Sequence, residues 1–536
     1  MQNDWWRGAV IYQIYPRSFM DSNGDGVGDL PGITGQLAYV AELGVDGIWL
    51  SPFFTSPMQD FGYDVADYRD VDPLFGTLAD FERLLARARE LGLKVIIDQV
   101  YSHTSDRHPW FQESRLSRDN AHADWYVWTD PRPDGAPPNN WQSVFGGVAW
   151  EWEPRRRQYY LHNFLKSQPD LNFHNPAVRE AILDIARFWL ERGVDGFRLD
   201  TANFYMHDAE LRDNPPKPVT DAVKPYDMQI HRYDRSRPEN LVFIQELRRV
   251  LDDYPGAMAV GEIFCEDQVG RMAEYTSGLG RLHTAYSFSF LEGPFEAGYI
   301  HDTLAQWESQ GLKAWPSWAF SNHDRPRVVS RWAGEDLSPT KAKLLIALLG
   351  SLRGSAFLYQ GEELGLPEAE IPYERIVDPD GLAFWPMNRG RDGCRTPMPW
   401  QADAAFGGFS TVEPWLPIDK PQLDRAVDLQ TRDGDSVLQF TRRFLGWRGQ
   451  QPALLRGSLE LLSLPAPLLG FLRAHGEQRL LCVFNLSGES RELPVPAAGN
   501  WQALEGAAPG AEIHGETLAL PGWGTLIASV ATTPAA

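Results

Sequence analysis

The chain has 536 residues, of which 43% are hydrophobic and 23% are charged, and its formal net charge is −22. This composition is typical of a globular protein of two to four domains. The acidic balance argues against nucleic acid or anionic lipid as a partner, because both are bound through basic patches. A neutral or cationic small molecule is compatible with it.

The N-terminal segment, MQNDWWRGAV, lacks the basic stretch and apolar run of a secretion signal. No window of the chain approaches the ~18 apolar residues that a membrane-spanning helix needs. The cysteines, Cys265, Cys394 and Cys482, are too few and too scattered for a disulfide framework or a zinc cluster. We therefore expect a cytoplasmic protein with reduced thiols and no membrane partner.

An acidic, glycine-rich segment, DSNGDGVGDL, follows the first predicted strand at residues 21–30. The spacing of Asp21, Asn23 and Asp25 matches the start of a helix–loop–helix calcium loop. Such a loop requires a bidentate Glu at its twelfth position, and this chain has Gly32 there. The calcium-loop pattern is therefore broken, and a different ion site and a plain acidic turn both remain open.

Short β-rich runs alternate with amphipathic helical stretches through the first 450 residues. In PAVREAILDIARFWLERG, for example, Val178, Ile182 and Trp189 share one helical face. Gly92 and Gly193 stand where two such helices should end, just before the next strand. The eight predicted strands are residues 10–16, 46–52, 94–100, 195–201, 257–263, 284–290, 315–322 and 355–362.

Eight strand–helix units with largely buried strands predict a closed parallel (β/α)8 TIM barrel, an α/β fold, with an open doubly wound sheet as the alternative. Between the third and fourth strands lie about a hundred residues, far more than an ordinary connection, so we expect an inserted subdomain there. After about 455 the pattern changes to short alternating strands, which predict a C-terminal all-β sandwich. The predicted domains are the barrel (1–103 and 175–455), the insert (104–174) and the C-terminal domain (456–536).

Chemically useful side chains follow several of these strands, at the end where β/α barrels place their active sites. Two acids facing one cleft are what glycosidic bond cleavage requires, one to attack or activate and one to move a proton. The residues at these strand ends are His103, Arg198, Asp200, Glu262, His323 and Asp324.

The acids of the fourth and fifth strands suit different roles. Arg198 and Asp200 are two apart on a strand and so share a face, and the guanidinium should lower the pKa of Asp200, as suits a nucleophile. Glu262 ends an apolar strand, where desolvation should raise its pKa, as suits a general acid. The alternative for Arg198 and Asp200 is a purely structural ion pair.

An ordered set of short motifs carries a resemblance over nearly the whole chain. DQVYSHTS, GFRLDT, GEIF and SNHD occur in that order on the predicted strands, together with QPDLN and RDGCRTPMPW. The set resembles the α-amylase superfamily of glycoside hydrolases (family thirteen), in its α-glucosidase and oligo-1,6-glucosidase branch. It is most similar to bacterial α-glucosidases that act on short substrates and readily transfer glucose to alcohols.

The resemblance implies a role for each matching position. Asp200 would be the nucleophile and Glu262 the acid/base, and Asp324 would hold the 2- and 3-hydroxyls of the sugar. An Asp60–Arg391 pair would seal the pocket beyond the 4-hydroxyl, so that only a chain end enters. The implied substrate-binding residues are Asp60, Tyr63, which would stack under the ring, His103, Phe145, Phe164, Arg198, Thr201, His323 and Arg391.

Two further features bear on specificity and on an ion. Thr201, directly after the predicted nucleophile, resembles the residue of α-1,4 enzymes, whereas valine there goes with α-1,6 linkages. The proline-rich loop 213–240 is either a lid that excludes long chains or a plain surface loop. The resemblance also implies one structural Ca²⁺ or Mg²⁺, held by side-chain oxygens of Asp21, Asn23, Asp25 and Asp29 and by the carbonyl of Val27.

These observations predict a retaining, exo-acting α-glucosidase that cleaves terminal α-1,4-linked glucose from substrates such as maltose through a covalent glucosyl-enzyme. We expect no organic cofactor, and either a monomer or a homodimer. One alternative is a sucrose- or maltose-acting transferase or isomerase of the same superfamily, which would exclude water from the same intermediate. Another is a non-catalytic relative, which the three retained carboxylates argue against.

Overall fold

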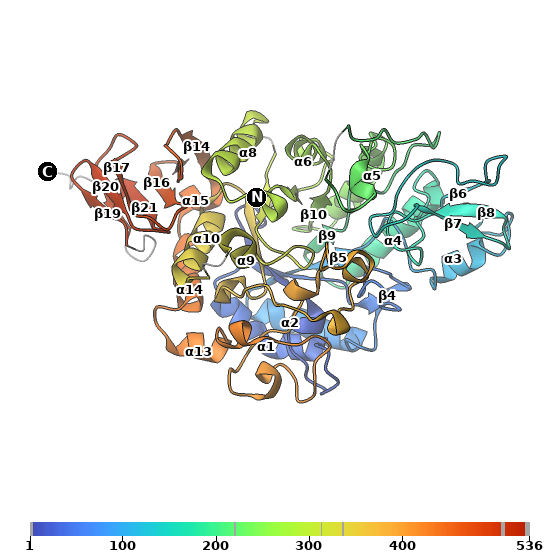
Figure 1. Ribbon diagram of the computed structural model, residues 1–536, viewed down its shortest axis with the longest axis horizontal. Coiled ribbons are helices and arrows are strands. Elements are labelled where there is room, and N and C mark those ends of the chain that lie inside the picture. The colour runs from blue at the N-terminus through green and yellow to red at the C-terminus, as the bar shows by residue number, and fades with distance from the viewer. Residues whose placement is uncertain (1–3, 219–220, 312–313, 335–336, 505–509, 531–536) are drawn as a thin grey trace.

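The computed structural model describes residues 4–218, 221–311, 314–334, 337–504 and 510–530 (Figure 1). Residues 219–220 of the predicted lid loop, and 505–509 and 531–536 of the predicted C-terminal domain, lie outside the described residues. Within the described ranges, no helix combines the length and apolar character needed to cross a bilayer.

Eight parallel strands form the centre of the molecule, and each predicted strand contains one of them. A parallel bridge between Ala285 and Pro316 joins the two ends of this sheet. The sheet therefore closes on itself, which confirms the barrel and excludes the open doubly wound alternative. In order around the barrel the strands are β11 (Thr284–Ser287), β10 (Met258–Ile263), β9 (Gly196–Leu199), β5 (Lys94–Gln99), β2 (Gly47–Leu50), β1 (Val10–Ile14), β13 (Ser355–Tyr359) and β12 (Ser317–Ala319).

Helices between the strands cover the outside of the barrel (Figure 1). Their ends follow the sequence signals: Thr77 and Asp80 form a capping box at the start of α2. Gly92 and Gly193 adopt φ angles of +76° and +92° just beyond α2 and α4. The longer helices are α1 (Leu30–Glu42), α2 (Leu78–Glu90), α4 (Pro176–Glu191), α5 (Asn240–Asp252), α6 (Gln268–Thr276), α8 (Ala297–Ser309), α10 (Pro339–Ser351) and α14 (Val437–Arg448). Shorter ones are α7 (Ser289–Glu292), α9 (Val328–Ala333), α11 (Pro379–Phe384), α12 (Lys420–Leu423), α13 (Val427–Arg432) and α15 (Pro452–Arg456).

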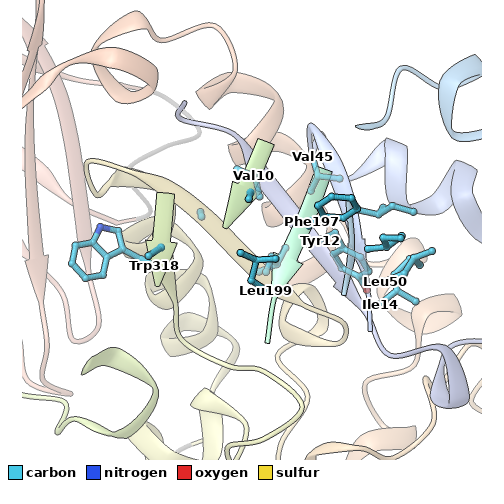
Figure 2. Packing of buried hydrophobic residues seen from close by; sticks show 14 of the residues in the cluster. Val10, Tyr12, Ile14, Val45, Leu50, Phe197, Leu199 and Trp318 are labelled. Atoms are coloured by element: carbon cyan, nitrogen blue, oxygen red, sulfur yellow. The ribbon is translucent and has the colours of Figure 1, made fainter. Parts of the chain in front are cut away.

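Successive apolar residues of most barrel strands alternate between two apolar clusters. Figure 2 shows members of the larger one, among them Val10, Tyr12 and Ile14 of β1 and Phe197 and Leu199 of β9. This cluster also contains apolar residues of the covering helices, so it lies between the barrel and its helices. The smaller cluster fills the barrel interior and consists chiefly of Ile11, Trp49, Ile96, Met258, Val260, Tyr286 and Phe357.

Three additions surround the barrel. A small antiparallel pair, β3 (Phe54–Thr55) and β4 (Asp67–Val71), follows β2. The insert after β5 contains α3 (Pro109–Ser114), β6 (Trp128–Thr129), β7 (Trp150–Glu153) and β8 (Gln158–Leu161). The C-terminal antiparallel sheets contain β14 (Ser458–Leu462), β15 (Leu468–His475), β16 (Gln478–Asn485), β17 (Arg491–Pro494), β18 (Trp501–Ala503), β19 (Glu512–His514), β20 (Thr517–Leu520) and β21 (Thr525–Val530). In Figure 1 these sheets and the insert lie at opposite ends of the long axis of the molecule.

Candidate active site

The inward-facing residues of the barrel strands change from apolar to charged toward the C-terminal ends. On β5, Ile96 is followed two residues later by Asp98, and on β10 Val260 is followed by Glu262. Because side chains two apart on a strand share a face, these acids stand directly above the apolar plug. These apolar side chains fill the barrel interior, so the charged side chains lie at the C-terminal ends of the strands.

Arg198 joins the acids of three neighbouring strands. Its Nη1 donates to Asp200 Oδ1 at 2.6 Å and to Asp98 Oδ1 at 2.8 Å, and its Nη2 lies 2.6 Å from Glu262 Oε1. The guanidinium is completely buried and also donates to the hydroxyl of Tyr286. The predicted shared face of Arg198 and Asp200 is confirmed. One guanidinium thus contacts three carboxylates. The sequence of any one strand does not show this, because the three acids come from three strands.

Burial controls the protonation of the two predicted catalytic acids. It raises the pKa of Glu262 to about 7, which confirms the expected effect of its apolar strand. It also raises the pKa of Asp200 to about 7, because desolvation outweighs the attraction of Arg198 and Asp98 adds repulsion. Arg198 does lower the pKa of Asp200, as predicted, but burial outweighs this contribution and the net pKa is raised. Near neutral pH the three carboxylates hold a proton among them.

Thr201 links the two acids through a strained backbone. Its φ angle is +39°, a conformation that is unfavourable for a β-branched residue. In this position its N–H donates to Glu262 Oε2 at 3.1 Å, and its hydroxyl donates to Asp200 Oδ2 at 3.2 Å. The strain accompanies a precise placement of both carboxylates, and the sequence gives no sign of it.

The predicted third acid, Asp324, stands in a different electrostatic setting. Burial opposes its ionisation, but the nearby positive charges of Arg391 and Arg395 hold the pKa of Asp324 well below its usual value. Arg395 contacts its Oδ1 at 2.9 Å and Arg391 at 3.2 Å. Burial also lowers the pKa of His323 well below its usual value, so this ring is neutral. Its Nε2 lies 2.5 Å from the hydroxyl of Tyr63.

Asp60 and Arg391 form the ion pair that the resemblance implies, with 2.9 Å between Oδ1 and Nη2. The second oxygen of Asp60 accepts a hydrogen bond from Gln168. Gln168 also lies against His103, and burial lowers the pKa of this imidazole to about 4. The pair is largely buried, which closes this side of the site.

These groups surround a single pocket of about 700 Å³, counting the part that opens to solvent. Phe145 and Phe164 supply apolar wall, and their rings lie 6.3 Å apart. Arg198 and His323 do not line the pocket. They contact the lining acids instead, Arg198 at Asp200 and His323 at Asp324. The predicted residues that line the pocket are Asp60, Tyr63, His103, Phe145, Phe164, Asp200, Thr201, Glu262, Asp324 and Arg391.

Several residues of the site were not predicted. Asp98 lies in the quoted motif DQVYSHTS, and an acid in the middle of an apolar strand was the available signal. Tyr286 hydrogen-bonds Glu262, but nothing in its run of apolar and small residues distinguishes it. Lys224 of the predicted lid loop and Asp380 of α11 also line the pocket. Their pairing joins segments distant in sequence, so no local pattern predicts it.

The acidic loop after β1 is organised by its own hydrogen bonds. Asp21 accepts from the N–H groups of Asn23 and Gly26, and Asp29 caps α1 through the N–H of Gly32. Within the described residues, no three His, Cys, Asp or Glu side chains gather in a metal-binding cluster. The donor set is all oxygen, as hard cations require. Both carboxylate oxygens of Asp21 already accept two hydrogen bonds each, Oδ1 from Asn23 and Gly24 and Oδ2 from Gly26 and Ser410.

A pair of carboxyl groups in one pocket is what glycosidic bond cleavage uses, and the C-terminal end of a β/α barrel is where such enzymes place their active sites. A protein-family model described as the alpha amylase catalytic domain matches residues 13–457. With this match and the relatives below, the chain belongs to the alpha-amylase family of glycoside hydrolases.

Known proteins resemble the chain over almost its full length. A "Probable alpha-glucosidase" of Rhizobium meliloti is 55% identical, over 98% of this chain and 97% of the relative. An "Oligo-1,6-glucosidase" of Heyndrickxia coagulans is 37% identical, over 94% and 96%. The crystal structure of XgtA, an "alpha-glucosyl transfer enzyme", superposes with a TM-score of 0.96 at 56% identity, over 98% of this chain and 99% of XgtA.

Proposed function

We propose that the protein is a retaining, exo-acting α-glucosidase that cleaves terminal α-1,4-linked glucose from short substrates such as maltose. The observation that carries this proposal is the shared contact of Asp200 and Glu262 with Arg198, at 2.6 Å each. It holds two pocket-lining carboxylates near each other, close enough for the ~5–5.5 Å separation of retaining enzymes.

The reaction follows as a double displacement. Ionised Asp200 attacks the anomeric carbon while protonated Glu262 gives its proton to the departing oxygen, which leaves a covalent glucosyl-enzyme. Glu262 then takes a proton from water or from an alcohol acceptor, and the new oxygen displaces Asp200 with the α configuration restored. A single proton shared among the buried carboxylates suits this division of roles, because one acid must begin ionised and the other protonated.

Two features support the exo action and the linkage. The buried Asp60–Arg391 pair closes the pocket, so a glucose unit enters only as a chain end. The hydroxyl of Thr201 donates a hydrogen bond to Asp200, and a valine at this position would lack that hydroxyl. The relatives include both an α-glucosidase and an oligo-1,6-glucosidase, so their names do not decide the linkage. The proposed α-1,4 preference therefore rests on Thr201.

A glucosyl transferase that acts on maltose or sucrose is the second candidate. The similarity to XgtA, named for glucosyl transfer, favours it, because both reactions pass through the same intermediate. Product analysis separates the two. Free glucose as the main product from maltose supports hydrolysis, whereas a predominance of transfer or isomerised sugars from maltose or sucrose supports the transferase.

Stereochemistry and two variants test the mechanism. Proton NMR of the first product should show α-glucose before mutarotation, and β-glucose would overturn the retaining mechanism. Asp200→Asn and Glu262→Gln should each remove nearly all turnover of maltose while the melting temperature stays near that of the unaltered protein. An Asp200→Asn protein that kept more than a few per cent of activity would show that the nucleophile is misassigned.

We also propose that the loop 21–29 binds one structural Ca²⁺ or Mg²⁺ through Asp21, Asn23, Asp25, Asp29 and the carbonyl of Val27. The all-oxygen donor set supports this, and the ion would stabilise the loop rather than take part in catalysis. A cytoplasmic location and a monomeric or homodimeric state stay predictions from the sequence.

A further inference from the structure

Asp378 stands where a helix cap is expected, but its side chain contacts a different part of the chain. It precedes Pro379, which opens α11, and an Asp in this position normally accepts a hydrogen bond from an N–H of the first helical turn. In the described structure its carboxylate makes no such bond. Asp419, by contrast, precedes α12, another short helix with a proline in its first turn, and caps it through the N–H of Gln422. The same local pattern thus has two outcomes.

The carboxylate of Asp378 holds both the backbone and the side chain of Arg391. Its Oδ1 accepts from Arg391 Nη2 at 2.6 Å, and its Oδ2 accepts from the backbone N–H of Arg391 at 2.7 Å. The Nε–H of Arg391 points between the two oxygens, at 3.1 Å and 3.2 Å. Gly390 permits this close approach, because a Cβ at that position would stand 2.6 Å from Asp378 Oδ2.

The other edge of the Arg391 guanidinium faces the acids of the pocket. Nη2 also donates to Asp60 Oδ1 at 2.9 Å, and Nη1 donates to Asp324 Oδ1 at 3.2 Å. A guanidinium is planar and rigid, so the contacts of Asp378 at Nε and Nη2 fix the direction of the remaining donors. Asp60, Asp324 and Arg391 line the pocket, whereas Asp378 is completely buried and does not. Asp378 can therefore act on a substrate only through Arg391.

Asp378 carries a negative charge in this setting. Burial opposes its ionisation, but the positive charges of Arg391 and Arg395 hold the pKa of Asp378 below its usual value. An asparagine in its place would have a similar size but no charge and a single acceptor oxygen. It could therefore accept from the backbone or from the guanidinium of Arg391, but not from both as Asp378 does.

We propose that Asp378 is a positioning residue, which holds the guanidinium of Arg391 against Asp60 and Asp324 before a substrate enters the pocket. The closed side of the pocket is then formed in advance, and no ordering of Arg391 is needed when the sugar binds. This inference rests on the proposed α-glucosidase activity and adds to it a residue that lies outside the pocket lining.

A double-mutant cycle between Asp378 and Arg391 tests the proposal, with kcat/KM for maltose as the measured quantity. Asp378→Asn alone should lower kcat/KM about tenfold, the loss of one hydrogen bond between charged groups. In the Arg391→Met background the same change should alter kcat/KM by no more than about twofold, because no guanidinium is left to position. Asp419→Asn is the matched control, since Asp419 caps its own helix and does not line the pocket, and it should leave kcat/KM within about twofold.

A second substrate separates positioning from a general loss of structure. The 4-deoxy analogue of a chromogenic α-glucoside lacks the hydroxyl that the proposed function places beside the Asp60–Arg391 pair. Asp378→Asn should lower kcat/KM about tenfold for the parent glucoside and no more than about twofold for the 4-deoxy analogue. If Asp378→Asn does not fold, the double variant Asp378→Asn/Arg391→Met is compared with Arg391→Met, because it buries neither member of this ion pair alone.

The outcomes separate the possible failures. Equal losses for Asp378→Asn with and without Arg391, no loss in the otherwise unaltered protein, or equal losses for the glucoside and its 4-deoxy analogue would each overturn the positioning role. A double variant with much lower kcat/KM than Arg391→Met would overturn it as well. An unaltered protein that turned over neither maltose nor the chromogenic glucoside would overturn the proposed function itself, and this role with it.

Discussion

Replacing Asp98 by asparagine removes one of the three carboxylates that share Arg198. Asp98 is completely buried and is outside the pocket lining, so it has no contact with the substrate. Its carboxylate raises the pKa of Asp200, to which it is joined through Arg198 Nη1 at 2.8 Å and 2.6 Å. The asparagine side chain keeps the size of the original and an acceptor oxygen but loses the charge.

The geometry sets the size of the effect. Both oxygens contact the same nitrogen, at 2.8 Å and 2.6 Å, so they are at most about 5.4 Å apart. Two unit charges at this distance repel by about 3 kcal/mol at an effective dielectric constant of about 20. This corresponds to about two pKa units. Asp98 itself has a pKa raised to about 6 by burial, so its own protonation already relieves part of the repulsion at lower pH. We expect the pKa of Asp200 to fall by one to two units in Asp98→Asn.

The assay is the pH dependence of kcat/KM for a chromogenic α-glucoside. Asp200 must be ionised to attack, so activity falls as the pH drops through its pKa, and the acid limb should move to lower pH in Asp98→Asn. Asp195→Asn is the control, because it removes a carboxylate that pairs with Lys94 at the opposite end of the barrel, and its acid limb should not move. An acid limb that stayed in place or moved to higher pH in Asp98→Asn would refute the shared-charge account.

Three further predictions test other parts of the site. Thr201→Val removes the hydroxyl that donates to Asp200, so the ratio of kcat/KM for isomaltose to that for maltose should rise roughly tenfold, and an unchanged ratio would separate Thr201 from linkage choice. Arg391→Met leaves the buried Asp60 carboxylate without its ion-pair partner and should lower kcat/KM for maltose about 100-fold. The double variant Asp60→Asn/Arg391→Met should lose much less activity than the product of the two single losses, because no charge is then left unpaired. Losses of the two single variants that add up in the double variant would contradict the role of the Asp60–Arg391 pair in closing the pocket. Removal of divalent ions by a chelator should lower the melting temperature, and an unchanged melting temperature with no metal in elemental analysis would make the loop at 21–29 a plain turn.

Much of the fold was predictable because its signals are local. Each barrel strand is a short apolar run, and helix ends such as Gly92 and Gly193 follow from backbone conformations that favour glycine. The side-by-side placement of Arg198 and Asp200 follows from the two-residue repeat of a strand. The site residues named through the family motifs also meet in one pocket, because the barrel brings its strand ends together.

The net pKa of Asp200 was not predictable, because it depends on burial and on how many acids share Arg198. Spacing along one strand reveals the nearest charge but neither the solvent exposure nor the neighbouring strands. Pairing between segments distant in sequence, as between Lys224 and Asp380, is hidden for the same reason. The strain at Thr201 is a property of its backbone conformation, and the N–H that it directs to Glu262 reaches a residue 61 positions away, so no local pattern shows it.

Covalent trapping examines the assignment of the nucleophile most directly. A fluorinated glucosyl fluoride, which forms the glucosyl-enzyme faster than water removes it, should add one sugar to the protein. Mass spectrometry of the digested protein should locate this sugar on Asp200, and Asp200→Asn should stay unlabelled. A label on any other residue, or full turnover without a trapped intermediate, would contradict the double displacement at this site.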